Sequence, residues 1–281
     1  MTDAAKNARI GARIDGVDPA LWLSEPERLA ELKALADERL VVTVAFTAPP
    51  TVEAVAALGR TLGCPDGPWP DRPGTVPGYG FIADFASDAR IDDGRARTPG
   101  WIEERLHFDG DSAYSVQVNL AGRPLAANRF ADMAALYADL PRELKAAVDR
   151  RCALHGHLPA TGMPMSEGKP FDAARARRAP LVVRHPRTGA PVMRPPASPQ
   201  SAIEGLPEDE GRAILAAIWA RADAAAHHVT LGEGEMLVWE GVGASHTNPG
   251  FARDRARRSW FFTVPAAWSE LAAHSPQSAF A

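Results

Sequence analysis

His107-Phe108-Asp109, together with His246 far downstream, is the part of this sequence that most strongly predicts its fold. Side chains two residues apart on a β-strand point to the same side, so His107 and Asp109 can bind one ion together. His246 follows the apolar run Met236-Leu237-Val238-Trp239, which is typical of a strand buried on both faces. Two imidazoles and one carboxylate leave the other positions of a metal ion open, which suits Fe(II) in an oxygenase. The pattern predicts a non-haem iron site with His107, Asp109 and His246 as ligands.

A candidate anion site follows the distal histidine, where Arg257 and Arg258 precede the stretch 259–264. An arginine that enters a buried strand is costly unless it pairs with an anion, and a guanidinium binds a carboxylate with two parallel hydrogen bonds. Adjacent side chains on a strand point to opposite faces. Arg258 shares its parity with Trp260 and Phe262, so we expect Arg258 to face a pocket and regard Arg257 as the weaker candidate.

These residues, in this order, resemble the taurine dioxygenase family of Fe(II)/2-oxoglutarate-dependent oxygenases. Four further stretches are similar to that family's opening strand, its next strand, its mid-chain helix and the strand before the distal histidine, namely 10–18, 40–44, 130–137 and 234–239. The resemblance implies a mixed α+β fold with a double-stranded β-helix (jelly roll) core and buttressing helices. Strands dispersed among helices favour the same architecture. We expect one oxygenase domain over 1–281.

The resemblance also implies a reaction. Fe(II) bound by His107, Asp109 and His246 would chelate 2-oxoglutarate, with Arg258 or Arg257 pairing the distal carboxylate. Dioxygen would be consumed, and decarboxylation of 2-oxoglutarate to succinate and CO2 would be coupled to hydroxylation or a related C–H oxidation. The substrate would be a small molecule. Halogenation is not expected, because related halogenating enzymes need a small residue where this chain has Asp109.

Several residues indicate which substrate and cosubstrate groups such a site would contact. Relatives that act on sulfonates often carry a second arginine four residues after the cosubstrate arginine, and with Arg258 in that role the position is Phe262. An anion against phenylalanine would lose its hydration uncompensated. We therefore expect that the substrate is not a simple sulfonate and that Phe262 and Trp260 contact it. Asn128 replaces a threonine that helps to bind the cosubstrate, and Glu103 falls where relatives place a polar substrate contact.

Other interpretations of the same residues remain open. A jelly-roll hydrolase or isomerase could bind Zn(II) with the triad but would not need a carboxylate-binding arginine. An inactive binding protein of this fold would be expected to lose a ligand or the arginine. Asp111 is expected to support the ligands or lie at the surface. His155 and His157 are spaced as His-x-His but lack a nearby third ligand, so we expect surface roles for both.

Composition excludes some partners. The 281 residues include 31 basic and 35 acidic side chains, a net charge of −4, and no long basic tract, so neither nucleic acid nor a membrane surface is expected. Cys64 and Cys152 exclude a disulfide framework and predict two buried thiols. The first residues lack the apolar core of a signal peptide, and no apolar run approaches a membrane span. We expect a cytoplasmic enzyme, and the sequence is compatible with a homo-oligomer.

Periodicity and turn residues predict the main elements. Helices are expected over 26–39, with Ser24 as a cap, over 51–62, and over 207–228, where His227 and His228 would end the helix. An alternating strand covers 114–120, and 181–184 and 191–193 form a hairpin. The regions 64–105 and 157–179 are rich in proline and glycine and are expected to be irregular loops beside the active site.

Overall fold

The computed structural model describes residues 10–64, 67, 70–71, 73–86, 106–109, 111–122, 127–155, 176–197, 201–247 and 258–266. Glu103, His157 and Arg257 lie outside these ranges, as do the greater parts of the two predicted loops. No helix within them is both long and apolar enough to cross a membrane.

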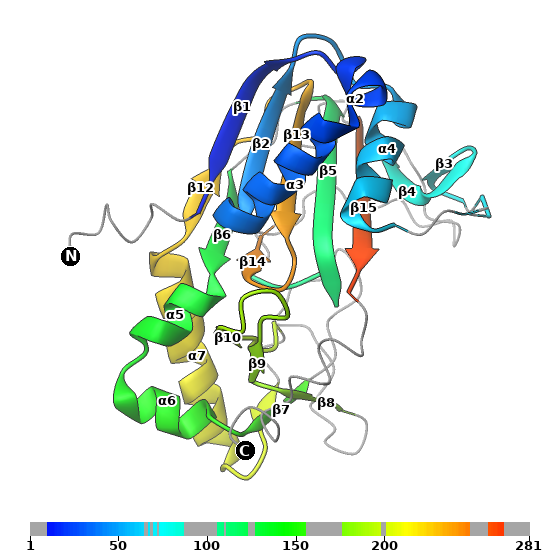
Figure 1. Ribbon diagram of the computed structural model, residues 1–281. Helices are drawn as coiled ribbons and strands as arrows, with labels where there is room; N and C mark the ends of the chain where they lie inside the picture. The colour runs from blue at the N-terminus through cyan, green and yellow to red at the C-terminus, as the bar shows by residue number, and fades with distance from the viewer. Residues whose placement is uncertain are drawn as a thin grey trace.

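A seven-stranded sheet is the largest element (Figure 1). Only β1 and β2 pair in parallel; the other neighbours are antiparallel. In spatial order its strands are β1 (Ala12–Val17), β2 (Val41–Phe46), β13 (Glu235–Glu240), β5 (Ser112–Ala121), β15 (Arg258–Pro265), β4 (Tyr79–Ala86) and β3 (Thr75–Val76).

Three smaller antiparallel sheets complete the described strands. The first contains β12 (His227–Val229), β6 (Asn128–Asp132) and β14 (Ala244–His246). The second contains β11 (Ala202–Ile203), β7 (Cys152–His155) and β8 (Arg177–Pro180), and the third pairs β10 (Pro191–Met193) with β9 (Val182–Arg184).

Helices α2 (Leu21–Ser24), α3 (Pro26–Arg39) and α4 (Val52–Leu62) cover one face of the large sheet (Figure 1). The side chain of Thr51 caps α4 by accepting a hydrogen bond from the Ala54 N–H, and Gly63 ends it at φ 113°, which favours glycine. The covered face contributes alternate residues to the main core: Val42, Val44, Val116, Val118, Met236, Val238, Phe262 and Val264. We call this the helix face of the sheet.

The opposite face of the large sheet, which we call the pocket face, carries the remaining alternate residues of each strand. Residues opposite each other on adjacent strands share a face, and two such rows are Trp239–Ser115–Thr263 and Leu237–Gln117–Phe261. Leu237 and Trp239 pack with Phe130 of β6 in a separate core cluster. The three-stranded sheet β12-β6-β14 therefore lies against the pocket face.

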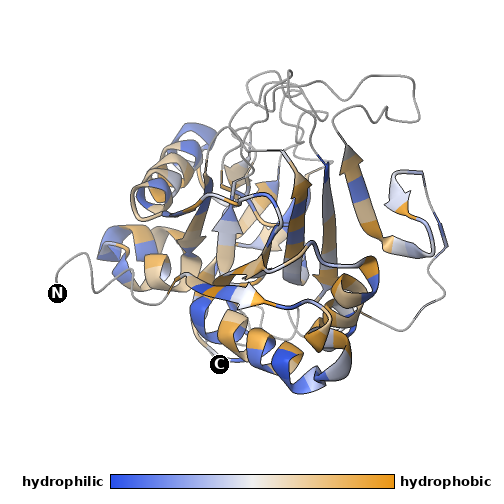
Figure 2. Cartoon of the chain, turned by 90° about the horizontal axis from the view of Figure 1, so that it is seen from above, coloured by the Kyte–Doolittle hydropathy of each residue, from blue (hydrophilic) through white to orange (hydrophobic). Residues whose placement is uncertain are grey.

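A second group of helices packs on the smaller sheets: α5 (Met133–Asp139), α6 (Arg142–Val148) and α7 (Glu208–Ala224). They share a core cluster with β9 and β10, including Met133, Leu181, Met193 and Ile218. Viewed from above, hydrophilic and hydrophobic residues alternate along the helices (Figure 2), as expected for elements with one face in a core.

Most predicted elements are confirmed, and four details are wrong. Helices 26–39 and 51–62, the hairpin and the strand over 114–120 are present. Glu25, with no side-chain cap, precedes α3 in place of Ser24, and His227 and His228 belong to β12. The helix expected at 130–137 begins at Met133, after strand β6. The region 64–105 contains β3 and β4, where irregular structure was expected.

Candidate metal centre

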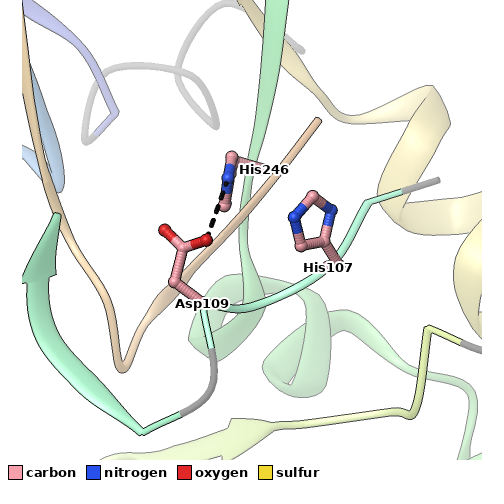
Figure 3. Close-up of side chains that lie close together, drawn as sticks. All are labelled: His107, Asp109 and His246. Atoms are coloured by element: carbon pink, nitrogen blue, oxygen red, sulfur yellow. Dashed lines mark ion pairs between the residues drawn. The ribbon is translucent and has the colours of Figure 1, made fainter. Parts of the chain in front are cut away.

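His107, Asp109 and His246 converge as the sequence predicted (Figure 3). One ligand atom from each side chain lies within 4.8 Å of the others. The Nε2 atom of His246 is 3.6 Å from Oδ1 of Asp109, and the two imidazole rings are 4.4 Å apart between centroids. Within the described residues no other group of His, Cys, Asp and Glu side chains is gathered in this way.

Backbone hydrogen bonds fix the two histidines opposite each other. The His107 N–H donates to the carbonyl of His246, and the His246 N–H donates to that of His107, both at 2.8 Å. This is a single bridge, so His107 and Asp109 do not form the regular strand that was expected. The side chains of His107 and Asp109 nevertheless both lie beside His246.

The surroundings of His246 favour a neutral imidazole. The residue is 1% exposed, and its ring lies 4.8 Å from that of Trp239 and 6.0 Å from that of Phe130. Burial lowers the pKa of His246 to about 4, with Asp109 opposing and His107 adding to the effect. Neither ring nitrogen has a hydrogen-bond partner among the described residues. A buried imidazole without partners is costly, and coordination of a metal ion by one nitrogen would remove part of that cost.

Ser115 orients the carboxylate. Its hydroxyl donates a 2.7 Å hydrogen bond to Oδ2 of Asp109, which leaves Oδ1 directed toward His246. Ser115 lies on the pocket face of β5, in the row that also contains Trp239. This residue was missed at the sequence level. The signal was present in 114–120, where the polar side chains Ser115, Gln117 and Asn119 alternate with apolar ones.

The prediction that Arg258 faces the pocket is wrong. Its side chain is 54% exposed and forms a bidentate ion pair with Asp84. The distances are 3.0 Å from Nε to Oδ1 and 2.6 Å from Nη2 to Oδ2. The register of β4 and β15 places Trp260 opposite Asp84, which is the parity of the helix face. The partly buried carboxylate of Asp84 is therefore the partner of this guanidinium.

Phe262 and Trp260 likewise turn away from the metal site. Phe262 is 2% exposed, packs edge-on against Phe81 and lies beside Gly59 of α4. Trp260 packs on the same core cluster. Large apolar side chains such as Phe262 and Trp260 are needed to pack under α4. This requirement determines which face of β15 points toward the helix. On the pocket face the corresponding aromatic residue is Phe261, whose ring is 6.1 Å from that of Trp239.

The remaining candidates lie near the site or outside it. Asn128 is buried, and its parity on β6 is that of Phe130, which stacks near His246. Asp111 pairs with Arg177 at 3.2 Å and is not part of the metal group. The Nε2 atom of His155 is buried, so the expected surface role is wrong for this residue. Cys64 and Cys152 are buried, free thiols, as predicted.

A 2-His-1-carboxylate group on a mixed α/β fold is typical of non-haem iron oxygenases. The sequence profile of the taurine catabolism dioxygenase TauD, TfdA family matches residues 2–264. The chain belongs to this family. No curated protein sequence matches it at a significant level.

Solved structures share the fold. A taurine dioxygenase from Burkholderia xenovorans has a TM-score of 0.69 and 22% identity, covering 93% of this chain and 88% of that chain. A putative alpha-ketoglutarate-dependent taurine dioxygenase from the same organism has a TM-score of 0.67 and 20% identity, with 93% and 91% covered. The structure of AAD-2 in complex with Mn(II) and N-oxalylglycine has a TM-score of 0.69 and 17% identity, with 93% and 96% covered.

Proposed function

We propose that this protein is an Fe(II)- and 2-oxoglutarate-dependent oxygenase that oxidises a C–H bond of a small molecule. The observation that carries the proposal is the convergence of His107, Asp109 and His246 within 4.8 Å, in a chain of a dioxygenase family. Bound iron would supply the redox chemistry by which dioxygen oxidises both 2-oxoglutarate, to succinate and CO2, and the substrate. The protein supplies ligands, orientation and exclusion of water.

The fold that we propose around this centre is a double-stranded β-helix. Its support is the arrangement of two facing sheets with the ligands between them. Trp239 of the large sheet and Phe130 of the β12-β6-β14 sheet are 5.6 Å apart between ring centroids, and His246 also belongs to the β12-β6-β14 sheet. Trp239 and Phe130 also keep water from the buried side of His246.

We infer that Arg257, rather than Arg258, pairs the distal carboxylate of 2-oxoglutarate. Arg257 has the sequence parity of Ser259 and Phe261, and the ring of Phe261 packs near that of Trp239 on the pocket face. Arg258 is already paired with Asp84 at the surface. The buried amide of Asn128 is a second proposed contact for the cosubstrate, since it shares the parity of Phe130.

The substrate that we propose does not present a sulfonate to this strand. With Arg257 as the cosubstrate residue, the position four residues later is Phe261; with Arg258 it would be Phe262. Neither side chain can pair an anion, and the guanidinium of Arg129 is already paired with Asp223 at 3.0 Å. Phe261 instead favours contact with an apolar or aromatic part of the substrate.

Measurement of succinate release tests both the proposed reaction and the proposed exclusion of sulfonate substrates. The protein loaded with Fe(II) is incubated in air with 2-oxoglutarate and with taurine, alkylsulfonates or a panel of uncharged aromatic and aliphatic compounds. We expect iron-dependent succinate that at least one uncharged compound stimulates and taurine does not. The His246→Ala variant should form none. Efficient oxidation of taurine by the wild-type protein would contradict the substrate assignment.

A further inference from the structure

Arg194 contacts both chain segments that carry the metal ligands. It follows β10 directly, and its guanidinium carbon lies 4.2 Å from the ring centroid of Phe108, the residue between His107 and Asp109. The Nη1 atom points at the carbonyls of Gly241 and Val242, at 3.5 and 3.4 Å, in long shared hydrogen bonds. These two carbonyls belong to the turn that leads from β13 into β14 and His246.

Other contacts hold the same turn, which we call the 241–243 turn. The carboxylate of Glu240 accepts hydrogen bonds from the N–H groups of Val242 and Gly243, at 3.2 and 2.5 Å. The Gly241 N–H donates to Ala113 at 2.7 Å. A side chain at Gly241 would collide with the backbone of Ser112, so the turn lies tightly against β5. Glu240 binds the N–H groups of the turn, and Arg194 reaches its carbonyls from outside.

The charge on Arg194 persists in this environment. Burial lowers its pKa to about 10, opposed by the charges of Asp111 and Glu240, so the guanidinium is protonated at neutral pH. A partly buried cation beside a site for a divalent cation repels that ion. The presence of Arg194 beside the proposed metal site therefore needs another explanation, and the contacts of its guanidinium provide one. A planar guanidinium can stack on an aromatic ring with its face while it donates hydrogen bonds from its edge.

We propose that Arg194 is a positioning residue that sets the spacing between the His107–Asp109 segment and His246. The proposal rests on the metal site of the proposed function. One end of the contact lies on Phe108 between two ligands, and the other end lies on the turn that begins the strand of the third. A ligand set whose spacing is fixed in advance binds a metal ion more tightly than the same set with loosely held spacing.

The test measures metal affinity directly. Apo wild-type protein, Arg194→Met, Arg194→Lys and the control Arg184→Met are titrated with Mn(II) and Co(II), and the visible spectrum of the Co(II) form is recorded. Arg194→Met keeps an unbranched apolar side chain but loses the whole guanidinium, both its face on Phe108 and its donors; Arg194→Lys keeps the charge but loses the planar group. Arg184, on the neighbouring strand β9, also donates to a carbonyl, that of Gly189, away from the metal segments.

We expect Arg194→Met to weaken metal binding about tenfold or more and to change the Co(II) spectrum, as loss of residues that orient metal ligands does. Arg194→Lys should weaken it by less, and Arg184→Met should match wild type. An electrostatic effect alone predicts the opposite, because removal of a positive charge would tighten binding of a cation.

The outcomes separate the two proposals. If Arg194→Met binds Mn(II) as tightly as wild type, or more tightly, the positioning role is excluded, even if the apo variant melts at a lower temperature. If that variant does not fold, unchanged affinity and spectrum in Arg194→Lys exclude the role in the same way. If the wild-type protein binds neither metal, the proposed metal centre itself fails.

Discussion

The ion pair of Arg258, at the start of β15, bears on which arginine we propose as the partner of the cosubstrate. Arg258 is half exposed and already carries Asp84 as its partner. An exposed ion pair of this kind contributes about 0.2–1 kcal/mol to stability. A desolvated arginine that loses its carboxylate partner costs about 2–5 kcal/mol. Because these two free energies differ several-fold, substituting each of the neighbouring arginines in turn should distinguish their roles.

The first prediction concerns these arginines. Arg257→Ala should raise the 2-oxoglutarate concentration needed for half-maximal succinate release by at least about tenfold, since the distal carboxylate loses its partner. Arg258→Ala should leave that concentration within about twofold and lower stability slightly. Steady-state succinate assays on both variants check this. A large effect confined to Arg258→Ala would show that the cosubstrate lies on the helix face.

The second prediction concerns pH. Burial, and then the charges of Arg177 and Arg194, lower the pKa of His155 to about 4, from an ordinary value of 6.5. Between these values the unfolded chain binds a proton at His155 and the folded protein does not. The free energy of unfolding therefore falls as pH decreases from about 6.5 to about 4, by up to about 3 kcal/mol from this residue.

His155→Gln should flatten that pH dependence, while substitution of the exposed His228 should not. Urea unfolding of both variants at pH 7 and pH 5 measures the difference. An unchanged slope in His155→Gln would mean that His155 is accessible to protons in the folded protein.

At the scale of the element, β15 separates a core face from a pocket face. Phe262→Ala should lower the free energy of unfolding by about 3–5 kcal/mol, because it empties a fully packed position under α4. Phe261→Ala, at a half-buried position on the pocket face, should cost less stability and alter substrate-stimulated succinate release. Equilibrium urea unfolding and turnover assays check the pair. Equal losses of stability would mean that both rings belong to the core.

Elements with a strong hydrophobic period were predictable from the sequence. Which of their faces lies in the core was not. Helix α3 and the alternating strand β5 follow from local pattern, and so does the hairpin around Gly189. The orientation of β15 did not follow, because Trp260, Phe261 and Phe262 give it apolar residues on both faces. Only the packing of Phe262 against α4 determines which face is inside. His227 and His228 were misassigned because pairing of β12 with β6 overrides the helical period.

At the scale of the molecule, the site depends on three distant segments. The metal ligands were predictable because their residue types and order are distinctive. Ser115 and Arg194 were not, since a serine and an arginine gain their roles only when β5 and the 241–243 turn come together around the ligands. The two facing sheets supply this arrangement, and a backbone bridge joins His107 to His246 at the edge of β14.

The most direct test of the central claim is an anaerobic titration of the apo protein with Fe(II) and then 2-oxoglutarate, followed by visible absorption. A 2-His-1-carboxylate iron centre that chelates a 2-oxo acid develops a weak metal-to-ligand charge-transfer band. We expect this band in the wild-type protein and not in His107→Ala, Asp109→Ala or His246→Ala. A folded wild-type protein that shows no band, or a His246→Ala variant that shows the full band, would contradict the assignment of the site.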